Sequence, residues 1–119
     1  MKAARFLLAA AFLAGCSQSA PQSADEALAA RENQALAPFK AKYKPVITGI
    51  DVKGATLDLF VDADQLNSMD EPVEDYMKTE ALQRWQALWK SNHPGKHATL
   101  RVRLRDYFGE EVFSESAKV

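Results

Sequence analysis

Two stretches of alternating apolar and polar residues constrain the fold of this chain most. Apolar residues recur at every second position through residues 46–62, on both sides of a turn at Lys53-Gly54, and again through residues 98–105. Alternation of this kind predicts strands with one buried face, and Gly54 provides the positive φ that a tight hairpin turn needs. A turn at residues 106–109, with Gly109 at the left-handed position, would return the second stretch as a further strand over residues 110–116. The sequence therefore predicts two β-hairpins.

An amphipathic helix is predicted between the hairpins. Apolar residues follow one another there at spacings of four, four, four and three: Val73, Met77, Ala81, Trp85 and Leu88. This period is typical of a helix that covers one face of a sheet. Pro72 fits its first turn, and Ser68 with Glu71 could form a capping box, with Asp70 as the rival cap.

A second helix is predicted before the first hairpin. Ser23 and Glu26 fit a capping box, residues 24–37 are rich in helix formers, and Pro38 should end or kink the helix. We therefore expect one α+β domain over residues 24–119: an antiparallel sheet of two β-hairpins packed on one amphipathic helix and preceded by an N-terminal helix. The sequence leaves the strand order open.

The charge and cysteine content exclude several classes of function. The 119 residues include 15 Lys and Arg against 16 Asp and Glu, for a net charge of −1. Such a balance gives no excess of positive field for binding nucleic acid. A lone cysteine, Cys16, can form neither an internal disulfide framework nor a cysteine-rich zinc site.

The N-terminus has the pattern of an export signal. Lys2 and Arg5 precede an uninterrupted apolar run, Phe6 to Leu13. This run is much shorter than the roughly 20 residues that a membrane-spanning helix needs, and it suits the apolar region of a signal peptide. Residues 1–15 are therefore predicted to be a signal peptide.

The end of this run, Leu13-Ala14-Gly15-Cys16, resembles the lipobox of bacterial lipoproteins. The resemblance implies cleavage before Cys16, attachment to its sulfur of one diacylglyceryl group with acyl chains such as palmitate, and acylation of the new amine. Two or three acyl chains anchor a protein to a bilayer, whereas one chain holds only marginally. Ser17, where the family's sorting rule would need Asp for inner-membrane retention, implies the outer membrane. Residues 16–23 would then form a lipid-anchored tether. The alternative to a lipobox is an ordinary signal peptide in which the cysteine is incidental.

Three arginines on one strand face form the candidate contact site. Arg101, Arg103 and Arg105 alternate with apolar residues, and Arg suits contacts to carboxylate, phosphate or acidic glycan groups. The other interpretation is a solvated face on which the arginines pair with acidic residues of neighbouring strands, namely Asp51, Asp58, Asp62, Glu111 and Glu115. A three-residue loop would place Arg105 opposite Glu111, Arg103 opposite Phe113 and Arg101 opposite Glu115. Three apolar residues are expected beside the arginines: Ile47, Phe60 and Phe113. Such a patch would favour a protein partner, or it would be covered by the N-terminal helix, which has apolar residues of its own to bury.

Evidence for a metal site or a catalytic site is weak. His93 and His97 flank a Pro-Gly pair that breaks the helix on which a His-x₃-His pair binds metal, and Asp62-x-Asp64 lacks the glycine of a calcium loop. We therefore expect no metal, no cofactor and no catalytic residue, and we interpret Trp85 and Trp89 as core residues.

The sequence thus predicts a membrane-anchored lipoprotein that faces the periplasm and acts as a non-enzymatic interaction or accessory module for an envelope protein. The alternative is an inhibitor or binder of a periplasmic hydrolase or an acidic ligand through the Arg-rich face. A small hydrolase is the third possibility.

Overall fold

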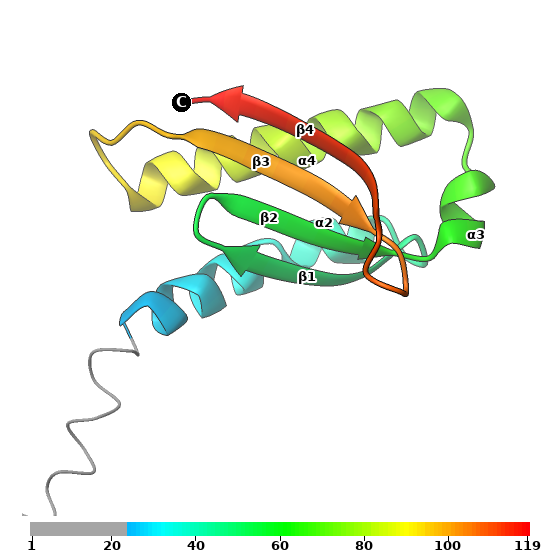
Figure 1. Ribbon diagram of the computed structural model, residues 1–119, viewed down its shortest axis with the longest axis horizontal. Coiled ribbons are helices and arrows are strands. Elements are labelled where there is room, and N and C mark those ends of the chain that lie inside the picture. Colours follow the sequence, from blue (N-terminus) through cyan, green and yellow to red (C-terminus); the bar gives the residue numbers. More distant parts are fainter. Residues whose placement is uncertain (1–23) are drawn as a thin grey trace, which may run out of the picture.

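The computed structural model describes residues 24–119 (Figure 1). The predicted signal peptide, Cys16, the tether and Ser23 of the first predicted capping box lie outside the described residues. In the described part, no helix is both long enough and apolar enough to cross a membrane.

Four strands form one sheet in the order β1-β2-β3-β4. Their bounds are β1 Ile47–Lys53, β2 Thr56–Val61, β3 Thr99–Arg105 and β4 Glu111–Lys118. The α+β class and the two antiparallel hairpins, β1–β2 and β3–β4, are confirmed. However, β2 and β3 pair in parallel, so the sheet is mixed rather than wholly antiparallel. The reason is the connection between them, which is long enough to carry a helix back along the sheet before β3 begins.

The N-terminal helical region bends at Leu36. A helix covers residues 24–35, and α2 (Ala37–Lys42) continues after one turn residue, with Pro38 in its first turn. The Leu36 N–H still donates to Glu32 O at 3.1 Å, and Lys40 N–H donates to Leu36 O at 3.1 Å. Pro38 has no N–H to continue this series of bonds, and the helix is interrupted just before it, which agrees with the prediction that Pro38 ends or kinks the helix.

Two helices connect the hairpins, α3 (Ala63–Asn67) and α4 (Glu71–Asn92). The short α3 was not predicted. The capping box of Ser68 and Glu71 was wrong: Ser68 ends α3, and its hydroxyl donates to Asp64 O at 2.9 Å. Asp70, the rival, occupies the N-cap position of α4, but its side chain makes no capping hydrogen bond.

The N-terminal helices and α4 cover the same face of the sheet and leave the other face open (Figure 1). The predicted stripe on α4 is buried at Met77, Ala81 and Trp85, whereas Val73 is 46% exposed. Trp85 is fully buried at the centre of the core, and its Nε1 donates to Ala55 O at 2.9 Å. The core interpretation of the two tryptophans therefore agrees with the structure, since Trp89 is also buried.

Glu80 links α2 to α4 through hydrogen bonds. Its carboxylate accepts hydrogen bonds from Lys42 Nζ at 2.8 Å, Tyr43 OH at 2.7 Å and Arg84 Nε at 2.7 Å. Burial alone would raise the pKa of Glu80, but the three donors outweigh it and lower the pKa to about 2. Burial and the bond to Glu80 together raise the pKa of Tyr43 above its ordinary range. The two helices are thus joined by a charged hydrogen-bond cluster as well as by apolar packing.

A β-bulge changes the predicted register of the second hairpin. Arg105 lies opposite Glu111 as predicted, but Leu104 is opposite Phe113, because one extra residue, Val112, interrupts the ladder on β4. Beyond the bulge the pairing predicted for Arg103 and Arg101 was therefore wrong, since a shift of one residue moves each side chain to the other face. The actual partners are Ser114 for Arg103 and Ser116 for Arg101.

Candidate functional site

The open face of the sheet carries the three arginines, two of which are paired internally. The parallel register places Arg103 beside Asp58. Asp58 is fully buried, and it accepts hydrogen bonds from Arg103 Nε at 2.7 Å, Arg103 Nη2 at 2.9 Å and Arg105 Nη1 at 3.2 Å. Burial acts to raise the pKa of Asp58, but the bonds from Arg103 and Arg105 prevail and lower it. The hydrogen bond to Asp58 also raises the pKa of Arg103.

Five acidic residues were proposed from the sequence as partners of the three arginines. Of these five, Asp58 is the one that forms ion pairs with Arg103 and Arg105. Of the others, Asp51 pairs with Lys53 at 3.5 Å, and Asp62 caps α3 by accepting from Gln65 N–H at 3.1 Å. Arg103 and Arg105 are therefore held by a buried carboxylate, whereas Arg101 is exposed.

The apolar residues expected beside the arginines are divided between the two faces. Phe60 is half-buried and pairs with Gly49 and Arg105 on the open face. Phe113 faces α4, where Lys78 Nζ lies 4.1 Å from the centre of its ring, and Ile47 is buried in the core. The expectation that Phe113 and Ile47 lie beside the arginines was wrong, because a β-bulge in each hairpin shifts the register near these residues.

The two histidines do not form a joint site. His93 Nδ1 lies 2.9 Å from Trp89 O, and His97 Nδ1 lies 3.1 Å from Val119 O. Within residues 24–119, no group of three or more His, Cys, Asp or Glu side chains could hold a metal ion.

The turn between β3 and β4 presents two aromatic side chains to solvent. Tyr107 is 90% exposed and Phe108 is 84% exposed, and their rings meet edge to face at 5.4 Å between centres. We call residues 106–109 the aromatic turn. The sequence predicted the turn itself but not this role, although two adjacent aromatic residues in a turn are a visible signal, because polar residues, Gly and Pro dominate turns.

The backbone of the aromatic turn is fixed by hydrogen bonds. Asp106 Oδ1 accepts from the N–H groups of Phe108 and Glu110, both at 2.9 Å. Arg105 Nε donates to Gly109 O at 2.9 Å, and Gly109 has the positive φ of +82° that the sequence predicted for this position. The exposed rings therefore stand on an ordered turn, which lowers the entropy lost when they contact a partner.

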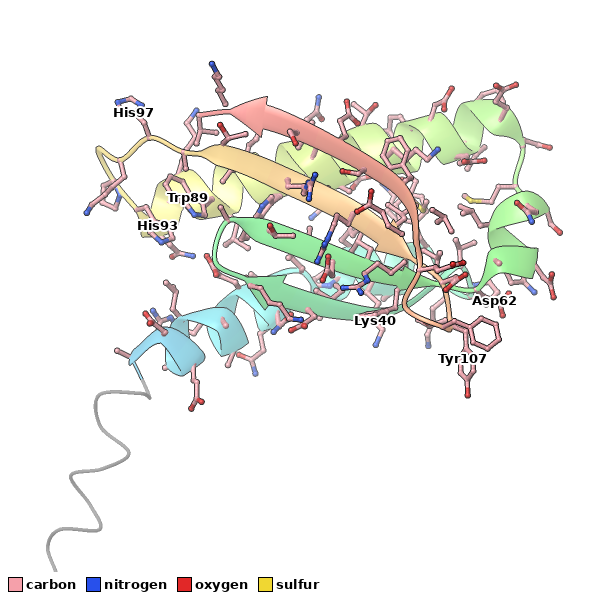
Figure 2. All side chains as sticks on the ribbon, viewed as in Figure 1. Lys40, Asp62, Trp89, His93, His97 and Tyr107 are labelled. Carbon is pink, nitrogen blue, oxygen red and sulfur yellow. The ribbon has the colours of Figure 1, made fainter. Side chains whose placement is uncertain are left out.

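A groove of about 600 Å³ runs between the aromatic turn and the start of α3. Tyr107 and Phe108 form one wall and Val61 and Ala63 contribute apolar surface, while three carboxylates border it: Asp62, Asp64 and Asp106. Figure 2 shows Tyr107 projecting from the body of the protein at the same end of the sheet as Asp62. The groove thus combines exposed aromatic groups with negative charge, which suits recognition of another molecule.

Comparison with known proteins gives little further information. No family model and no curated protein matches the sequence. Two solved structures show similarity: the pilotin AspS of the type II secretion system from Vibrio cholerae, and EpsS, the pilotin of the type 2 secretion system from Vibrio vulnificus. Each is 13% identical to this chain with a TM-score of 0.37, over 77% of this chain and 89% and 88% of theirs, respectively. Similarity of this extent establishes neither a shared family nor a shared function.

Proposed function

We propose that this protein is a lipid-anchored, non-enzymatic interaction module that faces the periplasm from the outer membrane and contacts an envelope protein. The lipobox-like sequence ending in Cys16 supports the anchor and the compartment. The observation that carries the interaction is the aromatic turn, in which two aromatic side chains are almost fully exposed on an ordered backbone. Aromatic residues of this kind supply much of the binding energy of protein interfaces.

The positions of the N-terminal end and of the aromatic turn fit a protein that is anchored at one end and binds its partner at the other. The described chain begins at one end of the longest axis, and the turn between β3 and β4 lies toward the other end (Figure 1). An anchor that precedes residue 24 would therefore leave the aromatic turn free to meet a partner.

The chemistry of the groove indicates the kind of partner. Apolar and aromatic walls favour an apolar side chain, and the three bordering carboxylates favour Lys or Arg next to it. We therefore infer a partner segment in which apolar and basic residues are adjacent. The same carboxylates oppose insertion of the turn into a bilayer that contains anionic lipids.

The alternative of an anion binder that uses the Arg-rich face has less support. It requires Arg103 to be available, but Arg103 and Arg105 are both bonded to the buried Asp58. Of the three arginines, the exposed Arg101 is the one without an ion pair in the described part of the chain.

The anchor can be tested by substitution of Cys16. Cys16→Ala should abolish labelling with a palmitate analogue in cells, because the thiol that accepts the lipid is gone. Fractionation should then find less protein in the membrane. Ser17→Asp is the matched control: it should keep the label and move the protein to the inner-membrane fraction. Retention of the label in Cys16→Ala would contradict the anchor.

The aromatic turn can be tested with a displayed library of random peptides, selected on the purified full-length protein. Selected peptides should place Lys or Arg beside aliphatic or aromatic residues. Tyr107→Ala with Phe108→Ala should weaken binding of a selected peptide by about tenfold or more, with no change in melting temperature, because both rings are solvent-exposed.

Tyr76→Ala is the matched control, since Tyr76 is an exposed aromatic residue of α4 that does not line the groove, and peptide binding should be unchanged. The proposal would be overturned if the selected peptides bound the double variant as tightly as the wild type. It would also be overturned if the turn bound phosphatidylglycerol vesicles and no peptide.

A further inference from the structure

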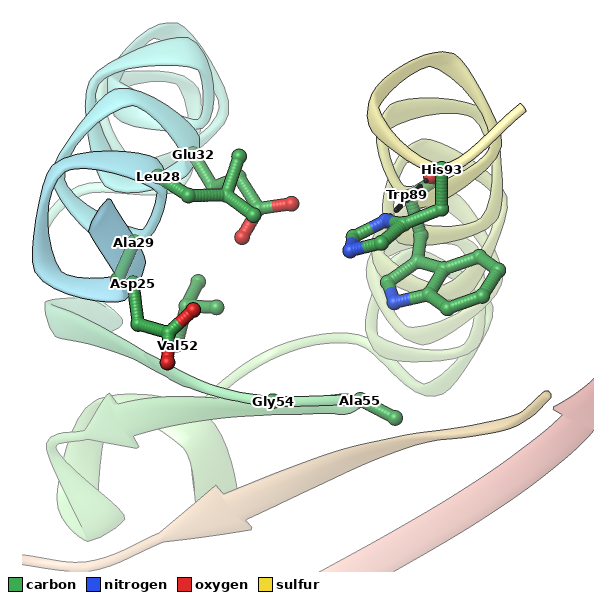
Figure 3. Close-up of a pocket in the computed structure, with 9 residues that line it drawn as sticks. All are labelled: Asp25, Leu28, Ala29, Glu32, Val52, Gly54, Ala55, Trp89 and His93. Atoms are coloured by element: carbon green, nitrogen blue, oxygen red, sulfur yellow. Dashed lines mark hydrogen bonds between the residues drawn. The ribbon is translucent and has the colours of Figure 1, made fainter. Parts of the chain in front are cut away.

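A cavity of about 380 Å³ lies between the N-terminal helix and the last turns of α4, far from the aromatic turn. Figure 3 shows the two helices as its side walls and the turn between β1 and β2 beneath it. Its volume lies within the range of about 300–1,000 Å³ that is usual for small-molecule sites.

One wall of the cavity holds a buried carboxylate with few partners. Glu32 is 2% exposed, and its Oε2 accepts from Asn92 Nδ2 at 3.1 Å. No described group donates to its Oε1. Figure 3 shows the carboxylate directed from the N-terminal helix toward α4. A buried carboxylate with a single neutral donor is costly unless a cation is supplied.

The opposite wall is aromatic and also offers an acceptor. His93 stacks on the buried Trp89, with 4.1 Å between ring centres and 16° between planes. Because the Trp89 carbonyl can only accept, the bond at 2.9 Å identifies His93 Nδ1 as the nitrogen that carries the hydrogen. In the neutral ring Nε2 is then an acceptor, and Figure 3 shows it facing the gap.

The remaining lining excludes an anionic ligand and favours a partly apolar one. The lining contains a second carboxylate, Asp25, and no Lys or Arg, while Leu28, Val52 and Ala55 are apolar. The carboxylates and His93 are not grouped closely enough to hold a metal ion, since the described residues form no such cluster. The ligand must therefore bring hydrogen-bond donors and positive charge on an organic body.

We propose that this cavity binds a small organic cation, a primary amine that carries an apolar or aromatic group. The ammonium group donates to Glu32 Oε1 and His93 Nε2. The apolar part of the ligand contacts Leu28 and Val52. This site is independent of the proposed contact at the aromatic turn.

The test is titration of the purified full-length protein with phenethylamine and, separately, with its uncharged analogue 2-phenylethanol. Binding is measured by calorimetry and by the NMR shifts of the Trp89 indole and the His93 ring. The amine should bind about tenfold or more tightly than the alcohol, and both sets of NMR signals should move with the same dissociation constant. Equal affinity for the two compounds would overturn the proposal.

Substitutions in the cavity test whether the amine binds there. Glu32→Gln keeps an acceptor for Asn92 and removes the charge, so it should weaken amine binding about tenfold, whereas Glu115→Gln, an exposed carboxylate on β4, should leave it unchanged. Ala29→Leu fills the cavity and should also abolish binding; it covers the case in which Glu32→Gln fails to fold. Unchanged binding in either folded cavity variant would contradict the site. The Tyr107→Ala and Phe108→Ala double variant should bind the amine normally, which separates this test from that of the proposed function.

Discussion

Replacement of Asp58 by alanine is expected to lower the free energy of unfolding by about 3 kcal/mol. The carboxylate is fully buried and receives three hydrogen bonds from two arginines. Its removal leaves two adjacent guanidinium groups without the charge that holds them together. Urea unfolding of the wild type and the variant at neutral pH measures the difference.

Asp51→Ala is the matched control for this experiment. Asp51 lies opposite Asp58 on the neighbouring strand, but its side chain is 42% exposed and pairs with Lys53 at 3.5 Å. An exposed pair of this kind contributes about 0–1 kcal/mol. Equal losses in the two variants would show that the Asp58 cluster does not stabilise the sheet.

The contribution of the ion pairs between Asp58 and the two arginines to the stability of the fold should depend on pH. The pKa of Asp58 in the folded protein is below its ordinary value of 3.8. Its stabilisation is therefore complete above that value and is lost as the pH falls through the lower, folded-state pKa. Below about pH 4 the wild type should lose stability more steeply than Asp58→Ala, which lacks this group.

Replacement of Trp85 by alanine should cost about 3–5 kcal/mol in the free energy of unfolding. Its side chain is fully buried between α4 and the sheet, and its Nε1 is bonded to Ala55 O. The substitution leaves a cavity in the core and removes this bond. Thermal and urea unfolding should both show the loss.

Two further substitutions interpret the result. Trp85→Phe should cost less, because a ring still fills much of the space, and Ala55 O keeps the bond from Arg101 N–H at 3.1 Å. Tyr76→Ala, on the same helix but 61% exposed, should change stability by no more than about 0.5 kcal/mol. A loss for Trp85→Ala as small as that for Tyr76→Ala would contradict the central place of this residue in the core.

Local sequence patterns were sufficient to predict the hairpins and the long helix, because the periods of two and 3.6 residues depend only on which side chains must be buried. The same is true of the interruption of the helix before Pro38 and the positive φ at Gly109, which are properties of single residues. The candidate contact site was less predictable. The alternating arginines, Arg101, Arg103 and Arg105, can be recognised in the sequence. Their ion pairs, however, depend on which strand lies next to β3.

What the sequence determined by itself was the two hairpins, the N-terminal helix, the long helix α4 and the lipobox-like pattern at Cys16, because each follows from neighbouring residues. The tertiary structure decided the parallel pairing of β2 and β3, and with it the contact between Asp58 and Arg103, 45 residues apart. It also decided the bulge that moves Phe113 to the helix side, the exposure of Tyr107 and Phe108, and the placement of Glu32 and His93 in the lining of one cavity. These depend on how distant segments pack, where one inserted residue or one change of strand direction alters every contact that follows.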